Sequence, residues 1–253
     1  MHMFYVTNTT ANIVLSGTTL DFDSSNADLL MIEGNDANSW GTAGSNGGTV
    51  TFTGMDETLK GNIEVDTISS LDAYFLDGTT YTGTISIVTN AVNTKASASP
   101  VTVNVSKDSS WIVTGDSTVS NLNVESGGKI VDESGKTVTI VANGQTVVKG
   151  DSSYTVTVTG TYGTTVTTDS DNALSTTYID RTGFDTTYGT STTFGQNAAA
   201  AASTTTASAT SSATASTTTQ TTSSNNTVYW IIGAIAAVVC AGCIIVFAAK
   251  KKQ

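Results

Sequence analysis

Two serine-containing tripeptides are the first candidates for chemistry, because such a serine could hydrolyse an ester. The tripeptide G-D-S occurs at residues 115–117 and again at residues 150–152, and this tripeptide can mark an esterase serine. A serine nucleophile needs a base, usually histidine, to take its proton. The only histidine is His2, close to the first residue. We therefore expect both triplets to be turns, in which glycine supplies positive φ and Asp and Ser cap the bend.

Paired carboxylates are the second candidate for chemistry. Asp66, Asp72 and Asp77 could provide two acids at the separation of about 5 to 9 Å that glycosidases use. A polysaccharide lyase would instead need a basic residue beside acid-bound Ca²⁺, and Arg181 is the only arginine. Nothing in the sequence aligns the three aspartates along one groove. We expect them to be solvated carboxylates in turns.

A third cluster, D-S-D-N, contains Asp169, Asp171 and Asn172. Its oxygens could bind Ca²⁺, which takes six to eight oxygen ligands. The spacing of an EF-hand loop and the glycine-rich nonapeptide are both missing, so a plain turn is expected. The sequence therefore predicts no catalytic residue, no metal ion and no cofactor.

The elements that must position these residues show internal repetition. D-S-S-W-I-V-T at residues 108–114 returns as D-S-S-Y-T-V-T at residues 151–157, 43 residues later. L-K-G-N-I-E-V at residues 59–65 is answered by Y-T-G-T-I-S-I at residues 81–87, an interval of 22. The first interval is close to twice the second, which predicts a solenoid with a repeat of about 22 residues. It also predicts that Trp111 and Tyr154 occupy the same station two coils apart.

Short apolar runs that alternate with polar residues recur between about residues 12 and 160, each bounded by Gly, Asn, Asp or Ser. This pattern, with a single proline at Pro100, predicts an all-β protein. An antiparallel sandwich would show the same alternation. The repeat period favours a parallel β-helix, whose coils stack at about 4.8 Å and would number about seven here.

Two segments resemble a known group of proteins. S-K-D-S-S-W-I-V-T-G-D-S-T-V-S-N-L-N-V-E-S-G-G-K-I at residues 106–130 and L-K-G-N-I-E-V-D-T-I-S-S-L at residues 59–71 are similar to recurring rungs of right-handed β-helical adhesins and autotransporter-type passengers. The resemblance covers residues 59–160. It implies a pectin-lyase-like right-handed parallel β-helix displayed at a cell surface. The chain departs from the autotransporter pattern because no series of amphipathic barrel strands follows.

The charge of the chain limits its partners. It has 21 acidic and 10 basic residues, and three of the bases are Lys250, Lys251 and Lys252 at the C-terminus. Binding to nucleic acid requires clustered lysine and arginine that displace counterions from phosphates. We therefore expect no nucleic-acid partner.

The C-terminal third changes composition. Residues 228–249 form an apolar run without charge, followed by K-K-K-Q, which predicts a membrane-spanning helix with a cytoplasmic basic end. The sequence thus predicts β-helix repeats over residues 1–160, a terminal coil or cap over 161–196, a disordered Ala/Ser/Thr-rich stalk over 197–227, a transmembrane helix over 228–249 and a basic tail over 250–253.

The opening residues contain no export signal. We expect either the C-terminal part of a longer exported protein, in which the helix stops transfer, or a tail anchor that leaves the body in the cytosol. The first fits the lysines better, and it makes the chain a single-pass cell-membrane protein with its bulk outside the cell. We expect an adhesin-like protein, not an enzyme, that binds glycans or surface proteins of a host or neighbouring cell. A polysaccharide-acting enzyme and a passive stalk remain the alternatives.

Overall fold

The computed structural model describes residues 1–35, 40–175 and 180–189. These residues belong to two compact units, of which the first extends from Met1 to Leu174. The first unit is built of β-strands, nearly all of them paired in parallel. The predicted all-β class is confirmed, and the antiparallel sandwich is wrong for the described residues.

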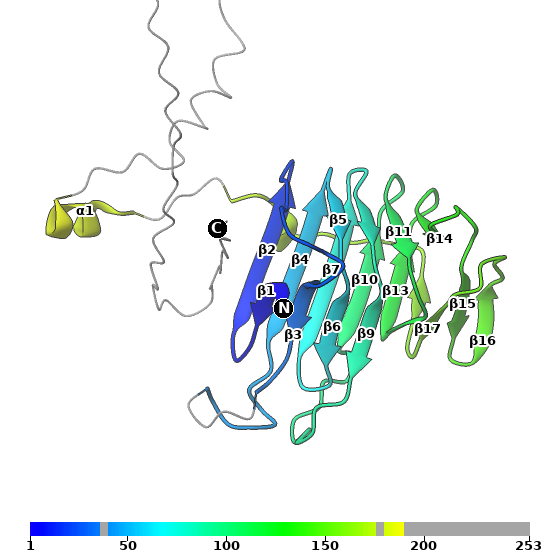
Figure 1. Cartoon of the computed structure of the whole chain (residues 1–253), viewed down its shortest axis with the longest axis horizontal. Helices are drawn as coiled ribbons and strands as arrows, with labels where there is room; N and C mark the ends of the chain where they lie inside the picture. Colours follow the sequence, from blue (N-terminus) through cyan, green and yellow to red (C-terminus); the bar gives the residue numbers. More distant parts are fainter. Residues whose placement is uncertain (36–39, 176–179, 190–253) are drawn as a thin grey trace, which may run out of the picture. The chain divides into compact units, whose positions relative to one another are not determined.

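The strands of the first unit form four sheets (Figure 1). Sheet A contains β1 (His2–Val6), β3 (Asp28–Ile32), β6 (Ile63–Asp66) and β9 (Ile85–Val88). Sheet B contains β2 (Thr10–Ser16), β4 (Thr49–Met55), β7 (Ser70–Leu76), β10 (Val101–Val105), β13 (Asn121–Val124) and β18 (Tyr162–Gly163). Sheet C contains β5 (Thr58–Lys60), β8 (Thr80–Thr82), β11 (Ser110–Val113) and β14 (Lys129–Asp132).

Sheet D contains β12 (Ser117–Val119), β17 (Thr155–Val158), β15 (Thr139–Ala142) and β16 (Gln145–Val148), in that order. Its β15 and β16 form the one antiparallel pair among the described strands. The N–H of Ile85 in β9 donates to Oγ of Ser117 in β12 at 3.2 Å. Sheet D therefore continues from the last strand of sheet A through a side-chain hydrogen bond.

The chain visits the sheets in a fixed order. It passes from sheet B to sheet C to sheet A in β4, β5 and β6, and repeats this path in β7, β8 and β9. Leu59 pairs with Tyr81, Ile63 with Ile85 and Val65 with Ile87. The predicted 22-residue register is confirmed here, and the path is compatible with a β-helix.

Coil length varies because loops are inserted at one corner. Equivalent residues are 21 apart between β4 and β7 but 30 apart between β7 and β10 and 39 apart between β2 and β4. Sheet A is joined to sheet B by the 3 residues 67–69 in one coil. Residues 33–48 and 89–100 make the same connection in others. The described parts of these two loops, residues 33–35, 40–48 and 89–100, project beyond the strand ends at one edge (Figure 1).

The expectation that Trp111 and Tyr154 occupy the same station is wrong. Trp111 lies in β11 of sheet C, paired with Tyr81 and Ile130, whereas Tyr154 precedes β17 of sheet D. Between the two copies the chain leaves the coil path to make the β15–β16 hairpin. The shared D-S-S-x-x-V-T pattern therefore encodes a polar turn followed by a strand, without fixing the sheet in which that strand lies.

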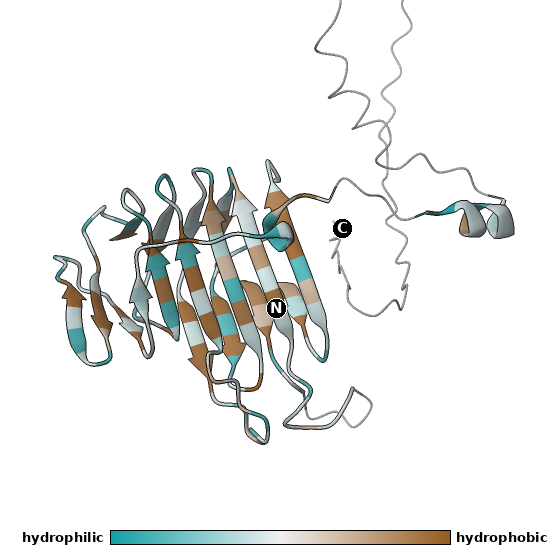
Figure 2. Ribbon diagram, turned by 180° about the vertical axis from the view of Figure 1, so that it is seen from behind, coloured by the Kyte–Doolittle hydropathy of each residue, from teal (hydrophilic) through white to brown (hydrophobic). Residues whose placement is uncertain are grey.

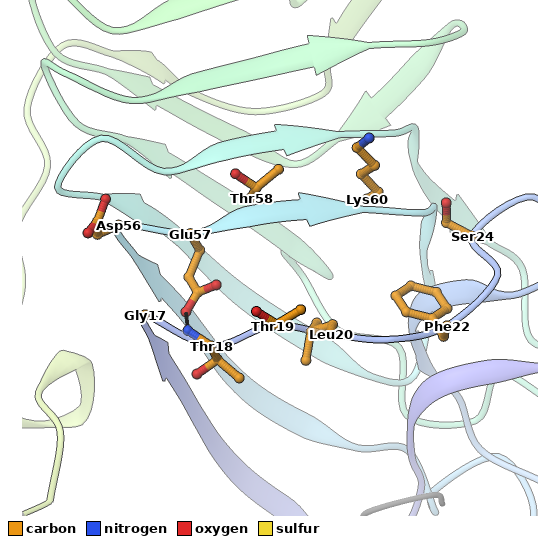
Figure 3. Close-up of a pocket in the computed structure, with 10 residues that line it drawn as sticks. All are labelled: Gly17, Thr18, Thr19, Leu20, Phe22, Ser24, Asp56, Glu57, Thr58 and Lys60. Carbon is orange, nitrogen blue, oxygen red and sulfur yellow. Dashed lines mark hydrogen bonds between the residues drawn. The ribbon is translucent and has the colours of Figure 1, made fainter. Parts of the chain in front are cut away.

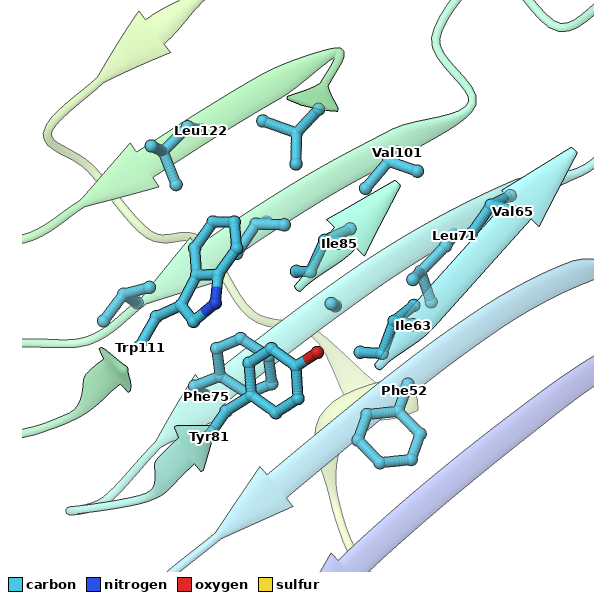
Figure 4. Close-up of a cluster of buried hydrophobic side chains, with 14 of the residues drawn as sticks. Phe52, Ile63, Val65, Leu71, Phe75, Tyr81, Ile85, Val101, Trp111 and Leu122 are labelled. Carbon is cyan, nitrogen blue, oxygen red and sulfur yellow. The ribbon is translucent and has the colours of Figure 1, made fainter. Parts of the chain in front are cut away.

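Inward side chains form the core of the stack, and large aromatic groups occupy its middle (Figure 4). The ring centroids of Phe75 and Tyr81 lie 4.9 Å apart and those of Tyr81 and Trp111 lie 6.2 Å apart. The indole Nε1 of Trp111 donates to the carbonyl of Gly83 at 2.9 Å, and the hydroxyl of Tyr81 donates to the carbonyl of Thr84 at 2.8 Å. Each buried polar tip thus has a backbone partner.

In the second unit the structure describes a short helix, α1 (Thr182–Tyr188). Arg181 lies 4.8 Å from the centroid of the Phe184 ring and 3.8 Å from the Asp185 carboxylate. Gly189 ends the helix in the left-handed conformation. The predicted stalk, transmembrane helix and basic tail, over residues 197–227, 228–249 and 250–253, lie outside the described residues.

Within residues 1–35, 40–175 and 180–189, no helix is both long enough and apolar enough to cross a bilayer.

Replacing Trp111 tests the central packing. We expect Trp111→Ala to lower the free energy of unfolding by about 3 to 5 kcal/mol, because it leaves a large cavity. Trp111→Phe should cost less, since the cavity is smaller, although it leaves the Gly83 carbonyl unpaired. Urea titration of the full chain, followed by far-UV circular dichroism, measures both. Trp40→Ala, at an exposed position, is the control, and an equal loss in the control would contradict this packing role.

Candidate functional site

The three aspartates considered as a carboxylate pair lie in different places. Asp66 ends β6 in sheet A and is 2 % exposed. Its carboxylate accepts hydrogen bonds from the N–H of Gly34 at 2.8 Å, the N–H of Ile68 at 3.2 Å and the side-chain amide of Asn90 at 2.7 Å. These bonds join three successive corners of the stack. Asp66 is therefore explained by a structural role.

Asp72 lies in β7 of sheet B, and Asp77 lies in the turn that follows this strand. Asp77 has a φ of 53° and Gly78 has a φ of 87°, which is the backbone of a tight turn. The structure does not bring Asp66, Asp72 and Asp77 to one groove. The expectation of a solvated turn carboxylate agrees with the placement of Asp77, but it is wrong for Asp66, which is buried, and for Asp72, which lies within a strand.

Both G-D-S triplets are held by bonds within the stack. Ser117 is buried, and its hydroxyl donates to the Gly115 carbonyl at 3.2 Å while it accepts from the N–H of Ile85. Asp116 accepts from the N–H of Thr155 at 2.8 Å. His2 lies in β1, at the far edge of sheet A, where its Nδ1 is 3.1 Å from the Asp28 carboxylate. This placement does not put the histidine beside the serine.

In the second triplet, the N–H groups of Asp151 and Ser152 both donate to the carbonyl of Thr137 at 3.0 Å. The side chain of Ser152 bonds to Asp132, and this is the main cause that lowers the pKa of the Asp132 carboxyl. The triplet is a turn that closes the β15–β16 excursion.

The D-S-D-N cluster forms a capping box around a single helical turn, η1 (Ser170–Asn172). The carboxylate of Asp169 accepts from the N–H of Asp171 at 2.8 Å, and the side chain of Asn172 accepts from the N–H of Asp169 at 3.0 Å. The amide of Asn172 donates to the hydroxyl of Thr53 in β4 at 2.9 Å. Among the described residues, no three His, Cys, Asp or Glu side chains converge as metal ligands.

Residues 164–174 form a strap that crosses the outer face of sheet B. The strap leaves β18 at one edge of the sheet, and η1 reaches β4 and β2 at the other (Figure 2). Asn172 is 5 % exposed, whereas most of the other strap residues are exposed. The largest lateral face of the stack is therefore partly covered by the chain itself, which the sequence did not predict.

The acidic groups of the strap and of sheet B affect one another's pKa values. Partial desolvation is the main cause that raises the pKa of the Asp72 carboxyl, and the negative charge of Asp169 raises it further. Burial likewise raises the pKa of the Tyr74 hydroxyl, with Asp72 and Asp169 adding to the effect. A hydrogen bond from Thr102 opposes the shift at Asp72. The strap thus brings an acid towards an acid already on the sheet.

The two corner loops present the clearest exposed surface for a partner. Trp40 is 55 % exposed and Val92 is 46 % exposed, one on each loop. The loops are joined because Oγ1 of Thr94 and the N–H of Lys95 both donate to the carbonyl of Gly44, at 2.7 Å and 3.0 Å. Loops held rigidly on a scaffold are common places for binding residues.

Asn46 fixes the loop that carries Trp40. Its side-chain amide donates to the carbonyl of Trp40 at 3.0 Å and to the carbonyl of Asn35 at 2.6 Å, and its own carbonyl accepts from the N–H of Asn8. Sequence reasoning missed this surface. The available signal was the length of the polar run between β3 and β4, which exceeds what one 22-residue coil needs.

Comparison with known proteins gives no family for this chain. No family model, no curated protein and no solved structure matches it.

The electrostatics at Asp72 predict a pH-dependent effect on stability. A carboxyl with a raised folded pKa stabilises the fold below its unfolded pKa, and this contribution is lost as the pH rises through the folded value. We therefore expect Asp72→Asn to increase the free energy of unfolding at neutral pH and to give little change at low pH. Urea titrations at several pH values measure this, with Asp77→Asn as the exposed control. A gain for Asp72→Asn that does not vary with pH would contradict the assignment.

The strap predicts a local unfolding step. Asn172→Ala removes the bond to Thr53 and the capping bond to Asp169, so we expect a loss of about 1 to 3 kcal/mol in the attachment of the strap. Limited proteolysis should cut residues 164–174 faster in this variant while the sheets remain folded. Ser170→Ala, at an exposed position in the same turn, is the matched control. Equal cleavage of the two variants would show that Asn172 does not hold the strap.

Proposed function

We propose that this chain is a right-handed parallel β-helix, displayed at a cell surface by its C-terminal segment, that binds glycans without cleaving them. The observation that carries the proposal is the pair of corner loops, which hold an exposed tryptophan on a rigid scaffold. An indole offers a flat apolar face and one polar N–H, so it suits a ligand that has both an apolar face and polar edges.

The chemistry around Trp40 supports a sugar as the ligand. Asn8 and Asn93 are exposed at the same corner. The backbone carbonyl of Asn46 accepts from the N–H of Asn8, and the hydroxyl of Thr67 donates to the side-chain carbonyl of Asn93. Amide side chains both donate and accept hydrogen bonds, as a sugar hydroxyl requires.

The repetitive stack supports display of such a surface. Weak contacts to single sugars become useful when many copies bind one glycan-coated surface, because effective concentration raises the overall affinity. The resemblance to β-helical adhesins, the Ser- and Thr-rich residues 197–227 and the apolar residues 228–249 agree with a role outside the cell.

Binding of the full chain to an array of host and plant glycans tests the proposal, with released reducing ends scored in parallel. We expect retention without released ends. Trp40→Ala should weaken retention by about tenfold or more, a loss of about 1.4 kcal/mol. Tyr188→Ala removes an aromatic side chain that is also exposed, and it should leave retention unchanged.

The other outcomes distinguish the rival functions. Released reducing ends would identify a polysaccharide-acting enzyme. A folded chain that retains no glycan would identify a passive stalk. Retention that is insensitive to Trp40→Ala would keep glycan binding but move it away from the corner loops.

A further inference from the structure

A slot lies beside β5, the edge strand of sheet C (Figure 3). Residues 17–24 run beside β5 without joining its sheet, and the space between them has a volume of about 480 Å³. Small-molecule sites usually have volumes of about 300 to 1,000 Å³. The slot is lined by Gly17, Thr18, Thr19, Leu20, Phe22, Ser24, Asp56, Glu57, Thr58 and Lys60.

One wall of the slot is a free strand edge. β5 bonds to β8 through the carbonyl of Glu57, which accepts from Thr80, and the N–H of Gly61, which donates to Thr82. Because alternate residues of a parallel strand face opposite neighbours, Thr58 and Lys60 turn their N–H and C=O groups towards the slot. No backbone hydrogen bond joins β5 to residues 17–24 within the described part of the chain. The wall therefore offers unpaired donors and acceptors.

Glu57 holds the slot open at one end. Its side chain reaches across the gap and accepts from the N–H of Thr18 at 2.7 Å (Figure 3). Glu57 is only 4 % exposed, and its backbone N–H donates to the hydroxyl of Thr79 at 3.2 Å. Glu57 is thus held by a residue of the next coil, so hydrogen bonds fix the two walls of the slot at this end.

The other lining groups combine hydroxyls with apolar surface. Thr19, Thr58 and Ser24 bring hydroxyl groups, whereas Leu20 and Phe22 are partly buried against the core and keep some surface exposed. A ligand that fits must have an apolar face and a rim of groups that donate and accept hydrogen bonds. A sugar ring has both.

We infer that this slot binds a single neutral hexose unit of a glycan, through the free edge of β5 and the apolar side chains of Leu20 and Phe22. This inference rests on the proposed glycan binding and adds a second subsite to the corner loops. The lining of the slot includes two carboxylates, Asp56 and Glu57, and one ammonium, that of Lys60. Together with the net charge of −11, this balance disfavours acidic sugars.

The test uses the full chain with glucose, galactose and mannose as neutral probes and glucuronate as the acidic one. Saturation-transfer NMR detects binding, and hydrogen–deuterium exchange locates it. We expect at least one neutral sugar to bind and to protect amides in residues 17–24 and 56–60. Glucuronate should bind at least about tenfold more weakly, a difference of about 1.4 kcal/mol.

Variants separate the slot from the corner loops. Thr19→Trp fills the slot from an exposed position, so it should weaken binding of the neutral sugar. Lys60→Ala removes an ammonium that can donate hydrogen bonds to sugar hydroxyls, so it should weaken this binding as well. Lys129→Ala is the matched control because Lys129 is also an exposed lysine of sheet C, three strands away on β14. The control should bind as the parent chain does.

Each result has a separate meaning. Sugar binding that is lost in Trp40→Ala but kept in Thr19→Trp and Lys60→Ala would overturn the slot and leave the proposed function standing. Binding of glucuronate in preference to neutral sugars would overturn the ligand class. Failure of every sugar and of the glycan array would overturn both proposals.

Discussion

The constraint on which the structure depends is that each inward side chain must lie above another inward side chain one strand spacing away, about 4.8 Å. Leu59, Tyr81, Trp111 and Ile130 form one such row. Tyrosine and tryptophan bring polar tips into this row, and the backbone carbonyls of the following corner accept their hydrogen bonds. A Cβ at Gly83 would meet the carbonyl of Gly61 in the coil below, so this position requires glycine. The corner glycines and the aromatic row therefore depend on each other.

Hydroxyl side chains complete the hydrogen bonding where the strands turn. Ser69 accepts from the N–H of Gly48 in the previous coil at 3.0 Å, and Ser120 accepts from the N–H of Val101 at 3.2 Å. Both serines are buried at corners that lead into sheet B, Ser69 after sheet A and Ser120 after β12 of sheet D. A buried N–H without a partner is costly. The abundance of serine and threonine thus has a structural cause in addition to any role on the surface.

Sequence patterns predicted the part of the fold that repeats. The echo of residues 59–65 in residues 81–87 gave the correct register because both copies lie in adjacent coils of equal length. The repeated heptapeptide gave a wrong prediction, because the same residue types recur wherever a polar turn precedes a strand. The strap could not be predicted, since its anchor pairs Asn172 with Thr53 across 119 residues. The turn position of the G-D-S triplets followed from residue type, but the expected positive φ was wrong, because neither Gly115 nor Gly150 has one.

The surfaces proposed for binding lie where the chain departs from the regular coil. Residues 33–48 and 89–100 lengthen the corner between sheets A and B in two coils. Residues 17–24 run outside sheet C without breaking the core beneath, where Leu20 and Phe22 still pack. A regular coil has every backbone group paired with its neighbours, so it offers a ligand only side chains. A departure exposes backbone groups while the adjacent coils keep them fixed. In this chain, binding capacity is therefore expected at the irregular positions, and the repeated rungs supply the rigidity that such positions need.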